Sequence, residues 1–211
     1  MPARTLDGRL LCASECAYEI ENPYFGGVGY LKHGVVTRIS LGVNSCLVGR
    51  TIDGIVVAFR GTQPDSFLDW LQNAAIFLRK VDGLPGRIHS GFYDAAIALY
   101  AQIKDCVLEL MKESCHWYTR RPKIYLTGHS KGGCLASLTA MFMALDNEIP
   151  KSDYVCTFGA ARIGDPDFEI IYDRLVNQVS YENYLDVVPF LPPGQVAVRA
   201  MSENTLMKIN E

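Results

Sequence analysis

A serine between two glycines is the first feature of this chain whose residue types point to chemistry. The segment GHSKG, residues 128–132, follows the apolar run KIYLT and precedes a helix-forming stretch of small and apolar residues. This G-x-S-x-G pattern is typical of a nucleophile elbow, a strained strand-to-helix turn that exposes a serine hydroxyl for attack on a carbonyl carbon. The helix N-terminus then directs backbone N–H groups at developing negative charge. Ser130 is therefore a candidate nucleophile, and the competing interpretation is a glycine-rich helix cap.

The surrounding sequence predicts the elements that would position Ser130. Apolar β-type runs and helical periodicity alternate along the chain, which indicates an α/β layered fold with a mainly parallel sheet. We expect strands within 35–49 and at 54–60, 123–127, 154–158, 177–185, 196–200 and 205–209, and helices at 9–20, 93–113, 131–146 and 165–176. The runs at 54–60, 123–127 and 154–158 should be adjacent central strands, with Ser130 on the turn after the second. No repeat or linker divides the chain, so residues 1–211 should form one domain.

The composition is that of a globular protein, with 49% hydrophobic and 20% charged residues. The net charge of −3 argues against nucleic acid as a partner, because phosphate backbones are bound by basic surfaces. No apolar run approaches the roughly 18 residues of a transmembrane segment. The first residues include Asp7 where a signal peptide needs an apolar block. We therefore expect a cytoplasmic protein, unless a preceding segment has been removed.

The seven cysteines include Cys46, Cys106, Cys134 and Cys156 among apolar neighbours, where a free thiol packs like a small hydrophobic group. Neither a CxxC pair nor a nearby histidine cluster accompanies them. We expect buried thiols in a reducing compartment, with metal binding as the weaker alternative.

Four segments, taken in order, make the chain resemble the class 3 lipases, the fungal-type triacylglycerol lipases and their bacterial, protist and plant relatives. The segments are VVAFRGT, HSGFYDAA, LTGHSKGG with TFGAARIGD, and NYLDVVPFLPP. They span residues 56–193, about two thirds of the chain. The resemblance implies an α/β-hydrolase fold with helices on both faces of the sheet. It also implies hydrolysis of acylglycerols or other lipid esters by a Ser-His-Asp triad, with no cofactor and no metal.

The resemblance assigns roles to single residues. Ser130 matches the nucleophile, and Asp186 in NYLDVVPFLPP matches the triad acid that holds the histidine in the required tautomer. Thr62 and Lys131 match the residues whose backbone N–H groups form the oxyanion hole. Without the family, Asp186 would be interpreted as a turn or capping aspartate.

Residues 63–70, QPDSFLDW, stand where the family has its lid. In that interpretation Phe67 and Trp70 contact lipid or cover the site, and the segment makes transient contact with a lipid interface. The alternative is an ordinary surface helix with two core aromatic residues.

Two positions depart from the family pattern. Lys131 stands where many members have leucine. The backbone donor survives this change, and we expect the ammonium group to point to solvent. Ala161 replaces a common proline, which should change only the stiffness of a turn.

The triad histidine is the residue that we do not find in this sequence. Family members carry it several dozen residues after the acid, but the four histidines here, His33, His89, His116 and His129, all precede Ser130. The His129 ring should point away from the Ser130 hydroxyl, His89 matches a structural position, and the other two should be exposed. We expect either a chain that stops short of the segment with the histidine, or a relative that has lost catalysis. Recruitment of His33 or His89 as the base would need a rewired topology.

The leading hypothesis is therefore a lipase-type serine ester hydrolase. The main alternative is a catalytically silent relative that binds lipid or acts as a scaffold. A serine without an adjacent base is not activated, so the 211-residue chain should have weak esterase activity at most. An acyltransferase would use the same residues, because only the second nucleophile differs.

Overall fold

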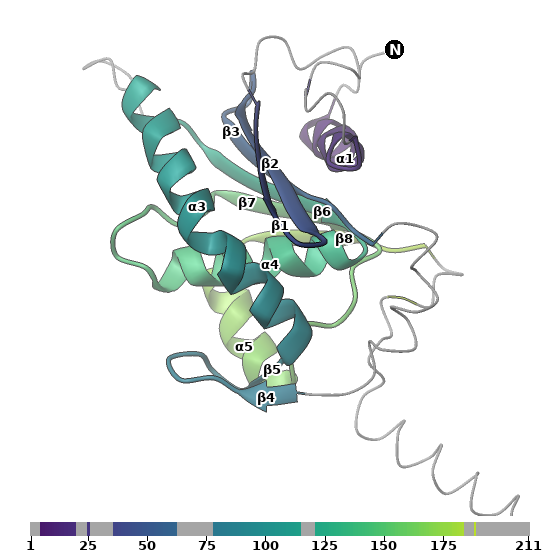
Figure 1. Cartoon of the computed structure of the whole chain (residues 1–211). Helices are drawn as coiled ribbons and strands as arrows, with labels where there is room; N and C mark the ends of the chain where they lie inside the picture. The colour runs from purple at the N-terminus through teal and green to yellow at the C-terminus, as the bar shows by residue number, and fades with distance from the viewer. Residues whose placement is uncertain are drawn as a thin grey trace, which may run out of the picture.

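The computed structural model describes residues 5–19, 25, 36–62, 78–114, 121–183 and 188 (Figure 1). Within these residues the main sheet has six strands in the order β1-β2-β3-β6-β7-β8. Their bounds are Val36–Leu41 for β1, Asn44–Arg50 for β2, Ile55–Phe59 for β3, Ile124–His129 for β6, Tyr154–Phe158 for β7 and Gln178–Tyr181 for β8. Strands β3, β6, β7 and β8 run parallel, whereas β1, β2 and β3 pair antiparallel. The three apolar runs are thus adjacent central strands, as predicted.

Apolar side chains explain why β3 and β6 lie at the centre of the sheet. All five residues of β3, IVVAF, are buried, and so are the first five of β6. A parallel strand in the middle of such a sheet is covered on both faces, so its sequence is continuously apolar. At the sheet edge, a turn at Gly42, with a φ of 57°, divides the β-rich stretch 35–49 into the hairpin β1–β2.

Helices cover both faces of this sheet (Figure 1). On one face, α1 (Leu6–Cys16) buries Leu10 and Ala13 against residues of β2, β3, β6 and β7. On the other face, α3 (Ser90–Ser114) and α4 (Lys131–Leu145) pack on the sheet and on each other, and α5 (Pro166–Leu175) lies beside α4. Every residue of α4 from 132 to 143 is buried, as expected of a helix that is apolar all round.

Polar contacts fix α1 to the sheet. Arg9 forms a bidentate pair with Asp53, at 2.6 and 2.7 Å. Asp7 accepts hydrogen bonds from the hydroxyl groups of Tyr154, at 3.0 Å, and Tyr181, at 2.6 Å. These contacts come from β7, β8 and the turn before β3. They hold the N-terminal end of α1 at a defined place over the sheet.

Some elements differ from the sequence prediction. Helix α1 begins and ends a few residues before the predicted 9–20. A two-stranded hairpin of β4 (Leu78–Lys80) and β5 (Arg87–His89) was not predicted, because its three-residue strands contain no apolar run. The predicted strands at 196–200 and 205–209 lie outside the described residues. Among the described helices, none combines the length and apolar character needed to cross a bilayer.

Candidate active site

Ser130 occupies a strained turn between β6 and α4. Its φ of 54° and ψ of −128° make it the one non-glycine residue with a positive φ in the described part of the chain. Such a conformation costs about 1–3 kcal/mol and persists only where the surroundings enforce it. Here the Ser130 N–H donates to the Phe158 carbonyl at 2.9 Å, and the Gly133 N–H donates to the Ser130 carbonyl at 2.9 Å. Both neighbouring elements, β7 and α4, therefore hold the turn.

The glycines around Ser130 are required by close backbone packing. A Cβ atom on Gly128 would lie 2.3 Å from the Gly132 carbonyl carbon, and one on Gly132 would lie 2.4 Å from the Phe59 carbonyl oxygen. A Cβ atom on Gly133 would lie 2.7 Å from Cβ of Ala160. The turn can therefore form only if these positions lack side chains, which is the reason the G-x-S-x-G pattern predicted it.

The Ser130 hydroxyl does not serve as a helix cap. Ser130 is the N-cap residue of α4, but its side chain makes no capping hydrogen bond. Its Oγ is buried and has no hydrogen-bond partner, and the residue is only 3% exposed. A serine at this position ordinarily accepts a bond from the first helical turn. Ser130 is thus the N-cap residue by position, but its side chain does not cap the helix and its Oγ makes no structural hydrogen bond.

The predicted oxyanion loop lies against this turn. A Cβ atom on Gly61 would lie 2.6 Å from the His129 carbonyl oxygen, so the backbone before Thr62 touches the backbone before Ser130. Thr62 Oγ1 is buried without a hydrogen-bond partner. Lys131 is the first residue of α4, where an N–H has no acceptor within the helix. The structure thus brings both loops together, and the convergence of the two N–H groups on one oxygen stays a prediction.

The Lys131 side chain does not point to solvent, and that expectation was wrong. Its Nζ donates a hydrogen bond to Asn44 Oδ1 at 2.6 Å, across the sheet edge at the start of β2. Burial lowers the pKa of the Lys131 ammonium, Cys134 partly offsets this, and the like charge of Arg60 lowers the pKa further. Asn44 therefore anchors α4 to β2. The two residues are 87 positions apart, so no local sequence pattern predicts this contact.

Tyr18, which follows α1, contacts both loops of the site and was missed by sequence reasoning. Its hydroxyl is hydrogen-bonded to Nδ1 of His129, the residue directly before Ser130, at 2.9 Å. A Cβ atom on Gly61 would lie 2.1 Å from the same hydroxyl oxygen. Burial raises the pKa of Tyr18, and a hydrogen bond with the Gly61 backbone acts in the opposite direction. A single hydroxyl thus joins the residues that directly precede Thr62 and Ser130.

The two described histidines do not supply the missing base. His89 is 7% exposed, stacks on Phe92 with a ring-centroid distance of 4.2 Å, and accepts a long hydrogen bond of 3.4 Å from the Phe92 N–H. His129 pairs with Tyr18, and neither ring is hydrogen-bonded to Ser130 Oγ. The structural role expected for His89 and the turned-away ring expected for His129 fit these contacts. The remaining predicted residues, which are Asp186, His33, His116 and the segment 63–70, lie outside the described residues.

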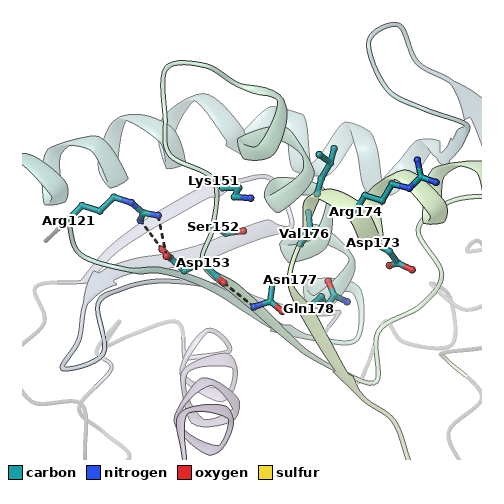
Figure 2. A pocket seen from close by; sticks show the side chains of 10 residues that line it. Arg121, Lys151, Ser152, Asp153, Asp173, Arg174, Val176, Asn177 and Gln178 are labelled. Atoms are coloured by element: carbon teal, nitrogen blue, oxygen red, sulfur yellow. Dashed lines mark hydrogen bonds and ion pairs between the residues drawn. The ribbon is translucent and has the colours of Figure 1, made fainter.

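A hollow of about 670 Å³ lies beside the segments that lead into β6, β7 and β8 (Figure 2). Its lining residues are Arg121, Lys151, Ser152, Asp153, Asp173, Arg174, Leu175, Val176, Asn177 and Gln178. They precede or open β6, β7 and β8, whereas Ser130 follows the carboxyl end of β6. Within the hollow, Arg121 is already paired with Asp153 at 2.8 Å. It is therefore not the pocket of the candidate nucleophile.

The described residues contain no group of three His, Cys, Asp or Glu side chains that could hold a metal ion. Four described cysteines, Cys16, Cys46, Cys134 and Cys156, are buried thiols that form no disulfide.

Comparison with known sequences gives a consistent set of relatives. The profile of the family described as lipase (class 3) matches residues 56–196. A lipase of Rhizomucor miehei is 30% identical over 150 residues, which are 66% of this chain and 38% of that protein. A lipase of Caenorhabditis elegans is 32% identical over 155 residues, which are 69% of this chain and 40% of that protein. The chain thus spans about two fifths of the length of these relatives.

Solved structures show the same architecture. The Rhizomucor miehei lipase propeptide complex superposes with a TM-score of 0.69 at 23% identity, covering 88% of this chain and 61% of that one. A triacylglycerol lipase whose catalytic centre is a serine protease triad superposes with a TM-score of 0.72 at 23% identity, covering 88% and 71%. The predicted α/β-hydrolase fold is thereby confirmed.

Proposed function

Because the chain belongs to the class 3 lipase family, we propose that Ser130 is the nucleophile of a lipase-type hydrolase that acts on acylglycerols or other lipid esters. The observation that carries this proposal is the Ser130 turn, which combines a positive φ with a buried Oγ that has no hydrogen-bond partner. The fold has no structural reason to maintain this strain, because the hydroxyl neither caps α4 nor forms any other hydrogen bond.

The reaction would proceed through an acyl-enzyme. Ser130 Oγ forms a bond to the ester carbonyl carbon, and its proton passes to a base. The carbonyl oxygen becomes an oxyanion that the N–H groups of Thr62 and Lys131 stabilise. The tetrahedral intermediate then expels the alcohol, which takes the proton from the base. Water attacks the acyl-enzyme in the same way and releases the carboxylic acid.

Asp186 would orient the imidazole that serves as this base. In the sequence it comes soon after β8, which runs parallel to β7 and β6 and therefore ends at the same edge of the sheet as they do. The imidazole itself does not come from residues 131–211, because that stretch contains no histidine. Free imidazole added to the solution is therefore the simplest way to supply it.

A catalytically silent lipid-binding relative is the second candidate, and one observation favours it. Both described histidines are engaged elsewhere, His89 with Phe92 and His129 with Tyr18. A fold that keeps the elbow without a base would retain the shape of the acyl site and lose turnover.

We also propose that residues 63–70 approach the lipid interface. Support comes from the position of this segment in the sequence, directly after Thr62, and from its two aromatic residues, Phe67 and Trp70. Vesicles or detergent micelles should then increase the rate at which Ser130 reacts.

The test is tributyrin hydrolysis by the 211-residue chain, with and without imidazole, measured as released butyrate. We expect a rate near background without imidazole and an increase of about tenfold or more with it, below the roughly 10²–10⁴ that a positioned base provides. The Ser130→Ala variant should show no increase. A folded chain without any Ser130-dependent rate in imidazole would favour the silent relative. A fast Ser130-dependent rate without imidazole would mean that a histidine has been recruited, which single His→Ala variants would identify.

A further inference from the structure

Buried polar atoms without hydrogen-bond partners gather beside the active-site loops. In the part of the chain that the structure describes, and apart from Ser130, Thr62 and Thr139, these atoms belong to three residues, Arg38 (Nε and Nη2), Ser45 (Oγ) and Arg60 (Nε). Buried donors without acceptors cost about 1–3 kcal/mol each, and more when they are charged. Their occurrence on neighbouring strands therefore calls for an acceptor.

The strand register places the three residues on one face and near one edge of the sheet. Arg38 of β1 pairs with Leu47 of β2, and Ser45 is two residues from Leu47, so the side chains of Arg38, Leu47 and Ser45 share a face. The Arg60 backbone N–H donates to the Ser45 carbonyl at 2.9 Å, which places Arg60, the residue after β3, next to Ser45. Leu47 packs in the core cluster of α1, which identifies the face.

Positive charge at this place is not balanced by a described carboxylate. Arg38 and Arg60 are half-buried, and neither forms an ion pair with any described residue. Arg60 uses Nη2 to donate to the Val43 carbonyl at 2.8 Å, which leaves its Nε free of acceptors. Burial and then the like charge of Arg60 lower the pKa of Arg38, as expected of two neighbouring cations. Lys131, bound to Asn44, adds a third cation nearby.

We propose that Arg38, Ser45 and Arg60 form a binding site for one carboxylate or phosphate group. The Nε and Nη2 atoms of a guanidinium form the edge that binds such anions with two parallel hydrogen bonds, and both are unpartnered in Arg38. Ser45 Oγ and Arg60 Nε supply two further donors on the same face. Arg60 directly precedes Gly61 and Thr62, so a bound anion would lie next to the oxyanion loop.

The site does not depend on catalysis, and its ligand chemistry is shared by two sources. A free inorganic anion would bind as phosphate alone. A lipid would bring a fatty-acid carboxylate or a phosphate headgroup to the same donors, and its acyl chain would then lie beside the elbow. The experiment therefore uses one probe of each kind and an uncharged control.

The test follows the arginine Nε–Hε signals of the 211-residue chain by NMR during titration with inorganic phosphate, with decanoate and with uncharged decanol. We expect a saturable shift of the Arg38 signal with phosphate or decanoate and none with decanol. Arg38→Gln should weaken binding by about tenfold or more, as loss of a bidentate charged pair does. Arg50→Gln, at the exposed far end of β2, should bind like the wild-type chain.

The two titrations distinguish the possible ligands. Saturation by phosphate assigns the site to a free anion or headgroup, and saturation by decanoate alone assigns it to a lipid carboxylate. No saturable shift of Arg38 in the wild-type chain would overturn the proposal, as would unchanged binding by folded Arg38→Gln. Should Arg38→Gln fail to fold, Ser45→Ala keeps both cations and must still weaken binding by several-fold.

Discussion

Ser130 holds a side chain in a backbone conformation that suits glycine better. The surrounding contacts enforce this, since β7 and α4 each contribute one hydrogen bond to the Ser130 backbone. The adjacent glycines leave no space in which the turn could relax. At the residue scale the candidate site is therefore defined by stored strain and by a hydroxyl without a structural partner.

Replacing Ser130 with glycine should relieve this strain. We expect Ser130→Gly to raise the free energy of unfolding by about 1 kcal/mol relative to Ser130→Ala, because alanine keeps the Cβ atom that disfavours a positive φ. Urea unfolding of the two variants measures the difference. Equal stabilities, or a less stable glycine variant, would mean that the turn is not strained.

Replacing Lys131 with leucine should leave the reactivity of Ser130 within a few-fold of the wild-type chain. The proposed oxyanion donor is the backbone N–H, and the ammonium group is occupied by Asn44. The imidazole-supported tributyrin rate checks this. A loss on the order of a hundredfold, the size expected for removal of an oxyanion donor, would give the side chain itself a catalytic role.

At the scale of elements, α1 is tied to the sheet and ends at the active-site loops. It lies before the family match, which begins at residue 56, yet Tyr18 contacts both Gly61 and His129. The two loops meet at the edge of the sheet, and Tyr18, two residues after α1, contacts both of them. Tyr18 is therefore a positioning residue in this account.

Tyr18→Phe removes the hydroxyl and should slow the imidazole-supported reaction of Ser130 by about tenfold, with a stability loss of about 1 kcal/mol. The matched control is Tyr154→Phe, which also removes a hydrogen bond to α1, through Asp7, but lies at the first residue of β7, at the opposite end of that strand from Phe158. Equal effects of the two variants on the rate, after correction for stability, would reduce Tyr18 to a structural contact.

The central strands were predictable because β3 is continuously apolar and β6 and β7 are mostly apolar. The elbow was predictable because the close backbone packing leaves no room for side chains at its glycines. The hairpin β4–β5 was not, since strands such as Leu78–Lys80 are too short to carry a pattern. Tyr18 and His129 are 111 residues apart, and Asn44 and Lys131 are 87 apart. Contacts of this kind depend on the strand order, so they appear only once the sheet is assembled.

At the scale of the whole molecule, buried thiols link stability to pH. Burial raises the pKa of Cys16 to about 11, and that of Cys134 and Cys156 to about 12. The same thiols in the unfolded chain ionise near pH 8.5. The folded state thus binds more protons than the unfolded state above that pH. The stabilisation is complete below about pH 8.5 and is lost as the pH rises toward 11 and above.

The free energy of unfolding should therefore fall by roughly 1 kcal/mol per buried thiol between pH 8 and pH 10. Urea unfolding under reducing conditions at both pH values measures this change. Cys156→Ala should show a smaller fall than the wild-type chain, whatever its stability at pH 8. A free energy of unfolding that is unchanged or higher at pH 10 would contradict the prediction.

The most direct test of the account is reaction of the 211-residue chain with a fluorophosphonate, followed by mass spectrometry of the intact protein and its peptides. We predict a single adduct on Ser130 that forms slowly, forms about tenfold faster with imidazole, and is absent from Ser130→Ala. An adduct on another residue, or a folded chain that remains unlabelled in imidazole, would contradict the claim that Ser130 is the nucleophile.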